Sequence, residues 1–334
     1  MTLPTKSVAD SPDPSAESGS ADHPAAASRS EAEAIFVVGV SRSGTTLLRK
    51  VLESHSRISI ASENHYLGHL LPGAGARHGF RRAGALDDDD AVRRLVAQIY
   101  SPEFQRGTRL REASPFWGWL ARNVPPADLE QRLLAAERTE RGIFTALLRT
   151  YADRRGKAII GEKTPAHLAS VDTLIEWYPD GRVVHMLRDP RAVFVSELRR
   201  RSEHAVTFPY RLLVRIPPLM RGFILLEVAW AWAGAVSRHR AYARRFSDAY
   251  RVVRFEDLVR DPDATVDDLC AFLGVVPEPA MLEQKVVSKG SLVGQAGFDA
   301  GAADRWRDTI SSGAARWLGR LLGRRIEEMG YPRS

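Results

Sequence analysis

Short apolar segments alternate with segments of helical spacing along most of this chain. The apolar segments are typical of buried strands, and they predict strands at residues 35–38, 57–60, 158–160, 182–187 and 251–255. Strands that alternate with helices pair in parallel, because each crossover needs a connection of about helix length. The pattern therefore predicts an α/β fold, a three-layer domain in which helices flank a central parallel sheet.

Helical spacing is clearest between the later strands. Apolar residues recur there every three or four positions, which predicts helices at residues 90–100, 127–136, 141–151, 221–246 and 314–329, the last of them basic and amphipathic. Residues 207–226 interleave Arg with large apolar side chains, and Pro217-Pro218 is expected to break any single helix there. We expect this segment to pack as core, with an acceptor pocket or contact with a membrane surface as open alternatives.

Composition changes abruptly near the start of the chain. The first 33 residues are rich in Ala, Ser, Pro and Asp and lack a hydrophobic period, so they are predicted to form a disordered tail. Residues 34–334 are expected to form one domain. The tail contributes −4 to the formal net charge of +7, so the domain carries +11. Such a basic surface favours anionic partners, among them nucleotides, sulfated products, lipids and nucleic acid.

The single cysteine, Cys270, excludes an internal disulfide and a thiolate zinc cluster. This composition and the lack of an apolar leader flanked by positive charge favour a cytoplasmic protein. The longest apolar run, residues 222–236, is shorter than the roughly 20 residues that cross a bilayer, and Glu227 interrupts it. We therefore expect no membrane span.

The sharpest motif is Gly39-Val40-Ser41-Arg42-Ser43-Gly44-Thr45-Thr46, between the first predicted strand and a helix. Glycines at this spacing are typical of a loop whose backbone N–H groups surround a phosphate at a helix N-terminus. A standard ATPase loop has Lys where this chain has Thr45, and Arg42 is the only cation inside the loop. The motif predicts a P-loop-like fold without assigning it to the ATPases.

This loop resembles the 5′-phosphosulfate loop of sulfotransferases that use 3′-phosphoadenosine 5′-phosphosulfate (PAPS). The later run Val183-Val184-His185-Met186-Leu187-Arg188-Asp189-Pro190 continues the resemblance, which is greatest to the tyrosylprotein and bacterial small-molecule branch. The resemblance implies that Ser43, Gly44, Thr45 and Thr46 hold the 5′ end of the donor. It also implies that Arg188 and Ser196 bind the 3′-phosphate, and a guanidinium and a hydroxyl from two directions suit that task.

Polar residues follow two further predicted strands. Ser62-Glu63-Asn64-His65 comes after the second strand and Glu162-Lys163-Thr164-Pro165 after the third. The carboxyl ends of parallel strands share one rim, so these groups are expected to meet the phosphate loop. By resemblance, Glu63 is the general base, and Lys163 and Arg42 stabilise charge on the transferred group. Glu162 stays open as an alternative base, and the histidines His65 and His167 are less favoured.

The late segment, residues 288–307, is glycine-rich and then basic. The family has a loop of similar character over the 3′-phosphate, which makes Arg305 or Arg307 a candidate ligand by resemblance. We expect no metal requirement, because arginine, lysine and loop amides can supply the electrostatic stabilisation that magnesium gives in kinases.

Together these features predict a sulfotransferase that moves a sulfuryl group from PAPS to an acceptor hydroxyl and releases adenosine 3′,5′-bisphosphate. The acceptor, a small molecule, a lipid or a tyrosyl group, is left open, as is peripheral membrane contact. The nearest alternative is an ATP-dependent small-molecule kinase. A basic nucleic-acid-binding protein is a second alternative that rests on charge alone, and no nucleic-acid partner is expected.

Overall fold

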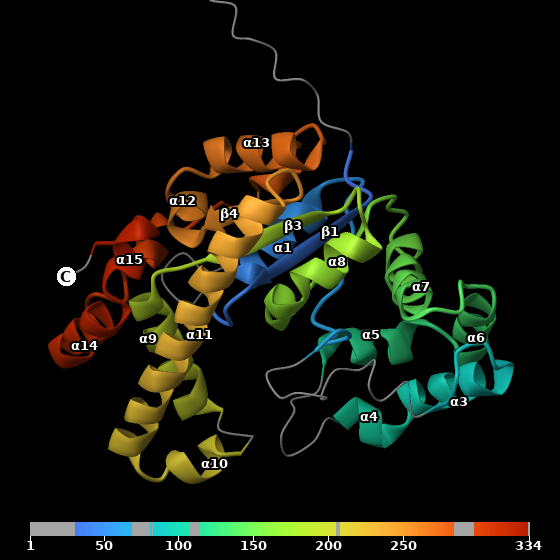
Figure 1. Cartoon of the computed structure of the whole chain (residues 1–334), viewed down its shortest axis with the longest axis horizontal. Helices are drawn as coiled ribbons and strands as arrows, with labels where there is room; N and C mark the ends of the chain where they lie inside the picture. Colours follow the sequence, from blue (N-terminus) through green and yellow to red (C-terminus); the bar gives the residue numbers. More distant parts are fainter. Residues whose placement is uncertain are drawn as a thin grey trace, which may run out of the picture.

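A four-stranded parallel sheet with the order β2-β1-β3-β4 lies at the centre of the molecule (Figure 1). A computed structural model describes residues 31–68, 81, 83–106, 114–204, 208–283 and 297–332. The strands are β1 (Ala34–Gly39), β2 (Ile160–Lys163), β3 (Arg182–Leu187) and β4 (Tyr250–Arg254). The predicted α/β class and parallel sheet are confirmed.

The described residues contain fourteen α-helices and three short 3₁₀ segments. The helices are α1 (Thr45–Ser54), α3 (Asp89–Tyr100), α4 (Pro102–Arg106), α5 (Pro115–Asn123), α6 (Pro126–Leu134), α7 (Glu140–Asp153), α8 (Val171–Trp177), α9 (Pro190–Glu203), α10 (Tyr210–Leu213), α11 (Pro217–Arg245), α12 (Phe255–Arg260), α13 (Pro262–Leu273), α14 (Ser312–Leu322) and α15 (Arg324–Glu328). The 3₁₀ segments are η1 (Pro165–Ser170), η2 (Pro279–Met281) and η3 (Ala300–Ala303).

The central strand β1 divides the core into two clusters. Phe36 and Val38 face one cluster, which includes residues of α3, α5, α6, α7 and α8. Ile35 and Val37 face the other cluster, with α1 and α13. Alternation along a strand buried on both faces produces this three-layer arrangement. A third cluster joins α9, α11 and α14 beside the sheet.

Three predicted elements differ from the structure. The strand expected at residues 57–60 makes only two isolated parallel bridges to the β2 region, at Ile58 and Ala61. The strand expected at residues 158–160 lies later in the chain, as β2 at Ile160–Lys163. The expectation for Pro217-Pro218 is confirmed, because α10 ends before these residues and α11 begins at Pro217, where a missing N–H costs nothing. The helix expected at residues 314–329 is two helices, because the chain turns at Gly323 with φ +50°.

The predicted disordered tail lies outside the described residues up to residue 30. Its last residues belong to the fold: the Ala32 amide donates to Leu273 at 3.0 Å, and the Glu33 amide donates to Asp180 at 3.2 Å. Ala32 is also buried. Two backbone bonds therefore attach the chain to the domain just before β1.

Candidate functional site

The loop between β1 and α1 folds in a way that requires its two glycines. A Cβ at Gly39 would lie 2.5 Å from the Met186 carbonyl oxygen, and a Cβ at Gly44 would lie 2.4 Å from the Phe255 ring. Gly44 also has φ +94°, in the left-handed region. The helix α1 then starts without a side-chain cap, so its first N–H groups are available to an anion.

Two buried polar groups beside this loop have no hydrogen-bond partner among the described residues. They are the Ser43 hydroxyl and the Nε group of Arg188. Buried polar atoms are usually paired in proteins, so both atoms have an unused hydrogen-bonding capacity that a ligand can fill. Both atoms suit the oxygens of a phosphate or sulfate group.

Arg188 follows β3 and is held on several sides. Its Nη2 donates to the Ala302 carbonyl at 3.0 Å, and its guanidinium lies 3.9 Å from the centre of the Phe255 ring. No carboxylate of the described chain forms an ion pair with it. Burial lowers the pKa of Arg188 to about 10, so the group stays charged at neutral pH. A charged, pre-oriented guanidinium without a carboxylate partner is suited to binding an anion.

Arg42 and Ser196 meet directly across the loop. The Arg42 Nε donates to the Ser196 hydroxyl at 3.1 Å, which joins the loop to the second turn of α9. Arg42 adopts a left-handed backbone conformation with φ +71°. Burial lowers the pKa of its guanidinium. The sequence analysis predicted that Arg42 lies at the transferred group and Ser196 at the 3′-phosphate of the donor. In the structure the two side chains are in direct contact.

Glu63 and Lys163 form an ion pair at the carboxyl end of the sheet. Lys163 is the last residue of β2 and is buried, whereas the Glu63 side chain is one-third exposed. His65 Nε2 lies 3.6 Å from the Glu63 carboxylate. A residue of α5 holds the backbone next to Glu63, because the Trp117 indole donates a hydrogen bond to the Asn64 carbonyl at 3.0 Å.

Glu162 is fully buried and faces away from this pair. Its carboxylate accepts hydrogen bonds from the Thr164 hydroxyl and, at 2.7 Å, from His167 Nδ1. His167 Nε2 in turn accepts the Leu67 amide at 3.1 Å, which requires the proton on Nδ1. Glu162 and His167 therefore hold the segment after Glu63 in place.

These groups surround a cavity of about 520 Å³ at the carboxyl rim of the sheet. Its walls come from the β1–α1 loop, α9, the Glu63 segment, α12 and the segment before α14. The lining residues are Ser41, Arg42, Gly44, Thr45, Thr46, Leu47, Glu63, Pro165, Arg188, Ala192, Val195, Ser196, Arg199, Phe255, Val259, Gly297, Phe298, Asp299, Ala302, Arg305, Trp306 and Thr309. Four arginines against two carboxylates make the wall cationic, which suits a ligand with more than one anionic group.

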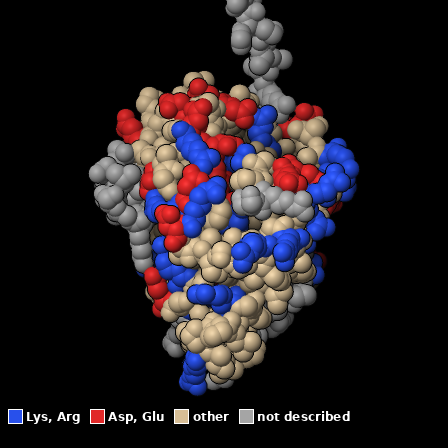
Figure 2. All heavy atoms as spheres, turned by 90° about the vertical axis from the view of Figure 1, so that its left-hand side faces the viewer, with Lys and Arg blue, Asp and Glu red and all other residues tan. Residues whose placement is uncertain are grey.

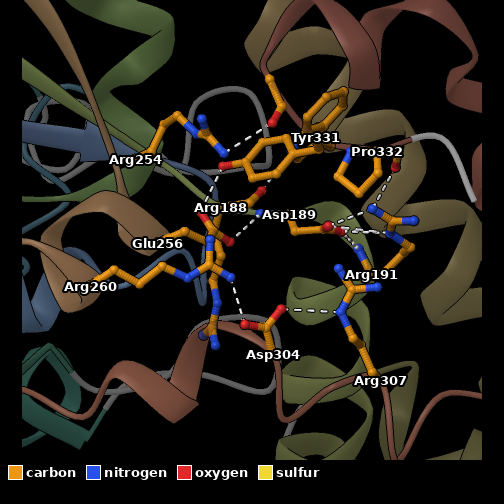
Figure 3. Close-up of polar contacts among 12 residues, drawn as sticks. Arg188, Asp189, Arg191, Arg254, Glu256, Arg260, Asp304, Arg307, Tyr331 and Pro332 are labelled. Atoms are coloured by element: carbon orange, nitrogen blue, oxygen red, sulfur yellow. Dashed lines mark hydrogen bonds and ion pairs between the residues drawn. The ribbon is translucent and has the colours of Figure 1, made fainter.

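The two late arginines have different positions. Arg305 lines the cavity and pairs with Asp299, whereas Arg307 donates to Asp304 at 3.1 Å. Asp304 also accepts from Arg260 at 2.5 Å, as Figure 3 shows. Part of the segment predicted to cover the donor, residues 288–296, lies outside the described residues.

A buried polar network ties the C-terminus to the strand end that carries Arg188 (Figure 3). The Glu256 carboxylate accepts the Asp189 amide at 3.1 Å and the Tyr331 hydroxyl at 2.9 Å. The Asp189 carboxylate caps α9 and accepts a bidentate contact from Arg191, whose Nη2 also reaches the Pro332 carbonyl at 2.7 Å. Burial raises the pKa of both Glu256 and Tyr331.

The sequence-predicted groups thus come together. Arg42, Gly44, Thr45, Thr46, Glu63, Arg188, Ser196 and Arg305 line one cavity, Ser43 lies inside the loop, and Lys163 reaches the cavity through Glu63. Sequence reasoning missed Phe255, Phe298 and Trp306 as lining residues, because isolated aromatic residues in helices and loops carry no spacing signal. Among the described residues, no cluster of three or more His, Cys, Asp or Glu side chains could hold a metal ion.

A glycine loop at a helix N-terminus, on a parallel sheet beside a cationic cavity, defines a P-loop-like fold with a cavity suited to an anionic ligand. The sequence profile of the sulfotransferase family matches residues 34–279. The chain belongs to the sulfotransferase family.

Three relatives illustrate the similarity. The nodulation protein NoeE of Sinorhizobium fredii is 26% identical over 90% of this chain and 66% of its own length. The omega-hydroxy-beta-dihydromenaquinone-9 sulfotransferase Stf3 of Mycobacterium tuberculosis is 26% identical over 72% of this chain and 62% of its own length. Mouse carbohydrate sulfotransferase 5 is 27% identical over 45% of this chain and 41% of its own. The chain spans less than two thirds of each relative's length.

Two solved structures share the fold. The sulfotransferase domain from the curacin biosynthetic pathway has a TM-score of 0.54 at 18% identity, covering 91% of this chain and 99% of that domain. The sulfotransferase domain of the Synechococcus PCC 7002 olefin synthase has a TM-score of 0.51 at 21% identity, covering 91% and 96%. Both likenesses support the predicted P-loop-like α/β fold.

Proposed function

We propose that this protein transfers a sulfuryl group from PAPS to an acceptor hydroxyl. The observation that carries the proposal is the pair of unpartnered buried groups, Ser43 Oγ and Arg188 Nε, beside one cationic cavity in a member of the sulfotransferase family. A donor with anionic groups at both its 5′ and 3′ positions can satisfy both atoms. The reaction is proposed to take place in the cytoplasm.

The donor would be held at two ends. The Ser43 hydroxyl and the backbone amides of Gly44, Thr45 and Thr46 at the α1 N-terminus surround the 5′ end, where charge builds up on the leaving phosphate. Arg188 and Ser196 bind the 3′-phosphate, and Arg305 adds charge from the opposite wall. The donor supplies the activated sulfuryl group. The chain supplies orientation and charge stabilisation, which are the main needs of an in-line transfer.

The acceptor would be activated by Glu63. Its carboxylate takes the hydroxyl proton as the new oxygen–sulfur bond forms and the bond from sulfur to the 5′-phosphate oxygen breaks. Lys163 and Arg42 stabilise the negative charge on the oxygens involved. Full burial and two hydrogen bonds to Glu162 support a positioning role for that residue and favour Glu63 as the base.

The acceptor is proposed only as a hydroxyl-bearing molecule. The names of two relatives specify a hydroxylated menaquinone derivative and a carbohydrate, both of which carry hydroxyl groups. Adenosine 3′,5′-bisphosphate is the expected second product.

The test compares Glu63→Gln with the parent protein. Calorimetry should show binding of adenosine 3′,5′-bisphosphate to both and weaker binding of Mg-ATP, which separates this function from a kinase. Mass spectrometry of hydroxylated metabolites incubated with PAPS should show the added sulfate with the parent, and at least a hundredfold slower formation with the variant. The exposed Glu103→Gln serves as the matched control. Equal turnover by Glu63→Gln would remove Glu63 from the mechanism, and failure of the parent to bind the bisphosphate would overturn the donor assignment.

A further inference from the structure

Large exposed apolar side chains gather on one part of this molecule. Nine such side chains are exposed among the described residues, and seven of them lie between residues 208 and 230. They are Phe208, Leu212, Ile216, Leu219, Phe223, Leu226 and Trp230, which we call the α10–α11 patch. Trp230 is 76% exposed and Leu226 is 57% exposed. Contiguous apolar surface of this kind marks an interaction site on a protein.

The patch follows one face of α11. Its members Leu219, Phe223, Leu226 and Trp230 are spaced by four, three and four residues, so they form one stripe about 17 Å long. The opposite face of the same helix carries buried residues such as Ile224, which pack in the cluster with α9 and α14. The stripe is therefore not needed to close the core, and nothing in the described chain covers it.

The charge around the patch is predominantly positive. Arg211, Arg215 and Arg221 are exposed beside the apolar side chains. Between residues 204 and 247 the sequence contains one acidic residue, Glu227, and the Tyr210 hydroxyl donates to it. Figure 2 shows the result: the lower end of the molecule is tan and blue, whereas red side chains gather in the upper half.

We propose that the α10–α11 patch docks the protein on the surface of an anionic lipid bilayer. Large apolar side chains enter the boundary between headgroups and acyl chains, and flanking arginines contact lipid phosphates while their stems lie along the apolar surface. A second protein chain would match the apolar stripe but not the three arginines without acidic neighbours. The positive charge thus favours an anionic partner, and the exposed Trp and Phe side chains favour the membrane–water interface.

The helix is proposed to lie on the membrane and not to cross it. By length and composition α11 could span a bilayer, and 39% of its most apolar window is buried inside the protein. Its buried residues join the same core cluster as residues of α9 and α14, and it also contacts β4. If α11 crossed the bilayer, its buried side chains would have to leave the core. Peripheral contact uses only side chains that are already exposed.

The docked orientation would bring the cavity near the membrane. The helix α9 lines the cavity with Ser196 and Arg199, and it packs along α11. The docking proposal does not depend on the proposed reaction, because vesicle binding is measured without donor or acceptor.

Co-sedimentation of the full chain with lipid vesicles tests the proposal. One set of vesicles is an equal mixture of phosphatidylglycerol and phosphatidylcholine, and the other is phosphatidylcholine alone. Three arginines near the surface should favour the anionic vesicles on the order of a hundredfold at low salt, and added salt should reduce that preference. Alkaline carbonate should release the bound protein.

Two double variants separate the patch from general surface hydrophobicity. Leu219→Ser with Leu226→Ser should weaken binding to anionic vesicles at least tenfold. Val276→Ser with Leu321→Ser, which changes the two exposed apolar residues outside the patch, should leave binding unchanged. Both variants alter exposed side chains, and circular dichroism checks that they fold.

Three outcomes would overturn the proposal. One is the absence of parent binding to anionic vesicles at millimolar lipid. Another is retention in the membrane after carbonate, which would mean that α11 spans the bilayer. The third is a dimer in solution that dissociates when Leu219 and Leu226 are changed, which would mean that a second copy covers the patch.

Discussion

Replacing Arg188 by Met tests the proposed binding of the donor's 3′-phosphate in the cavity. The Arg188 guanidinium is half-buried and stacks on Phe255, and its buried Nε has no partner among the described residues. Met has a similar length and no donor, so it removes the charge and the N–H groups without adding a polar group to the buried site. Donor affinity should therefore fall while the fold is retained.

The size of the loss follows from the bonds that Arg188 can offer. A hydrogen bond to a charged group contributes about 1.5–3 kcal/mol, and the Nε group is free for at least one. One strong bond, together with the lost charge, corresponds to about a hundredfold rise in Kd. The pKa of about 10 keeps the parent guanidinium charged at about pH 7.5, so the comparison at that pH measures the charged form.

The assay is isothermal calorimetry with two nucleotides. Adenosine 3′,5′-bisphosphate has the 3′-phosphate that Arg188 is proposed to bind, and adenosine 5′-monophosphate lacks it. Arg188→Met should weaken the bisphosphate about a hundredfold and the monophosphate less than about threefold. Arg307→Met is the control, since Arg307 donates to Asp304 and does not line the cavity.

Equal weakening of the two nucleotides would contradict this role of Arg188. If Arg188→Met weakens both nucleotides equally, the residue supports the cavity without contacting the 3′-phosphate. Because both nucleotides are measured on the same folded variant, a general loss of structure cannot imitate a selective loss.

Two further predictions concern the loop and the buried histidine. Gly44→Ala forces a Cβ into the Phe255 ring at a φ of +94°, so it should abolish bisphosphate binding and lower the melting temperature. Gly313→Ala, which has open space around it, should change neither property. Unchanged binding by Gly44→Ala would contradict the proposed loop geometry. Burial lowers the pKa of His185 to about 3. Below about pH 6.5 this imidazole is therefore protonated in the unfolded chain but stays neutral in the folded protein. The parent should therefore lose about 2 kcal/mol of unfolding free energy between about pH 6.5 and pH 5 from this group. His185→Gln keeps a polar partner for the Tyr250 hydroxyl and should show a flatter urea-unfolding profile over that range; equal slopes would exclude His185 as the cause.

Patterns local in sequence could be predicted well. The strand at Arg182–Leu187 was predicted to the residue, since an apolar run with a polar end has clear limits. The loop from Gly39 to Thr46 was predicted from its glycines and its place between strand and helix. The meeting of Glu63 and Lys163 followed from one rule, that parallel strands end at one rim.

Features that depend on long-range contacts could not be predicted in the same way. Glu63 and Glu162 are equally acidic residues after neighbouring strand segments, and only their surroundings differ. Glu162 is enclosed by Thr164 and His167, while Glu63 faces the cavity. Tyr331 lies 75 residues from Glu256 in sequence, yet their side chains form a buried hydrogen bond.

Sequence alone was enough to establish the parallel α/β class, the glycine loop between β1 and α1, and the set of polar residues at the strand ends. These depend on periodicity and on backbone conformations that few residue types can adopt. Long-range packing fixes which carboxylate faces the cavity, the contact between Arg42 and Ser196, and the apolar face of α11 that is left uncovered. Burial and pairing are properties of atoms brought together from distant parts of the chain, and spacing along the sequence does not encode them.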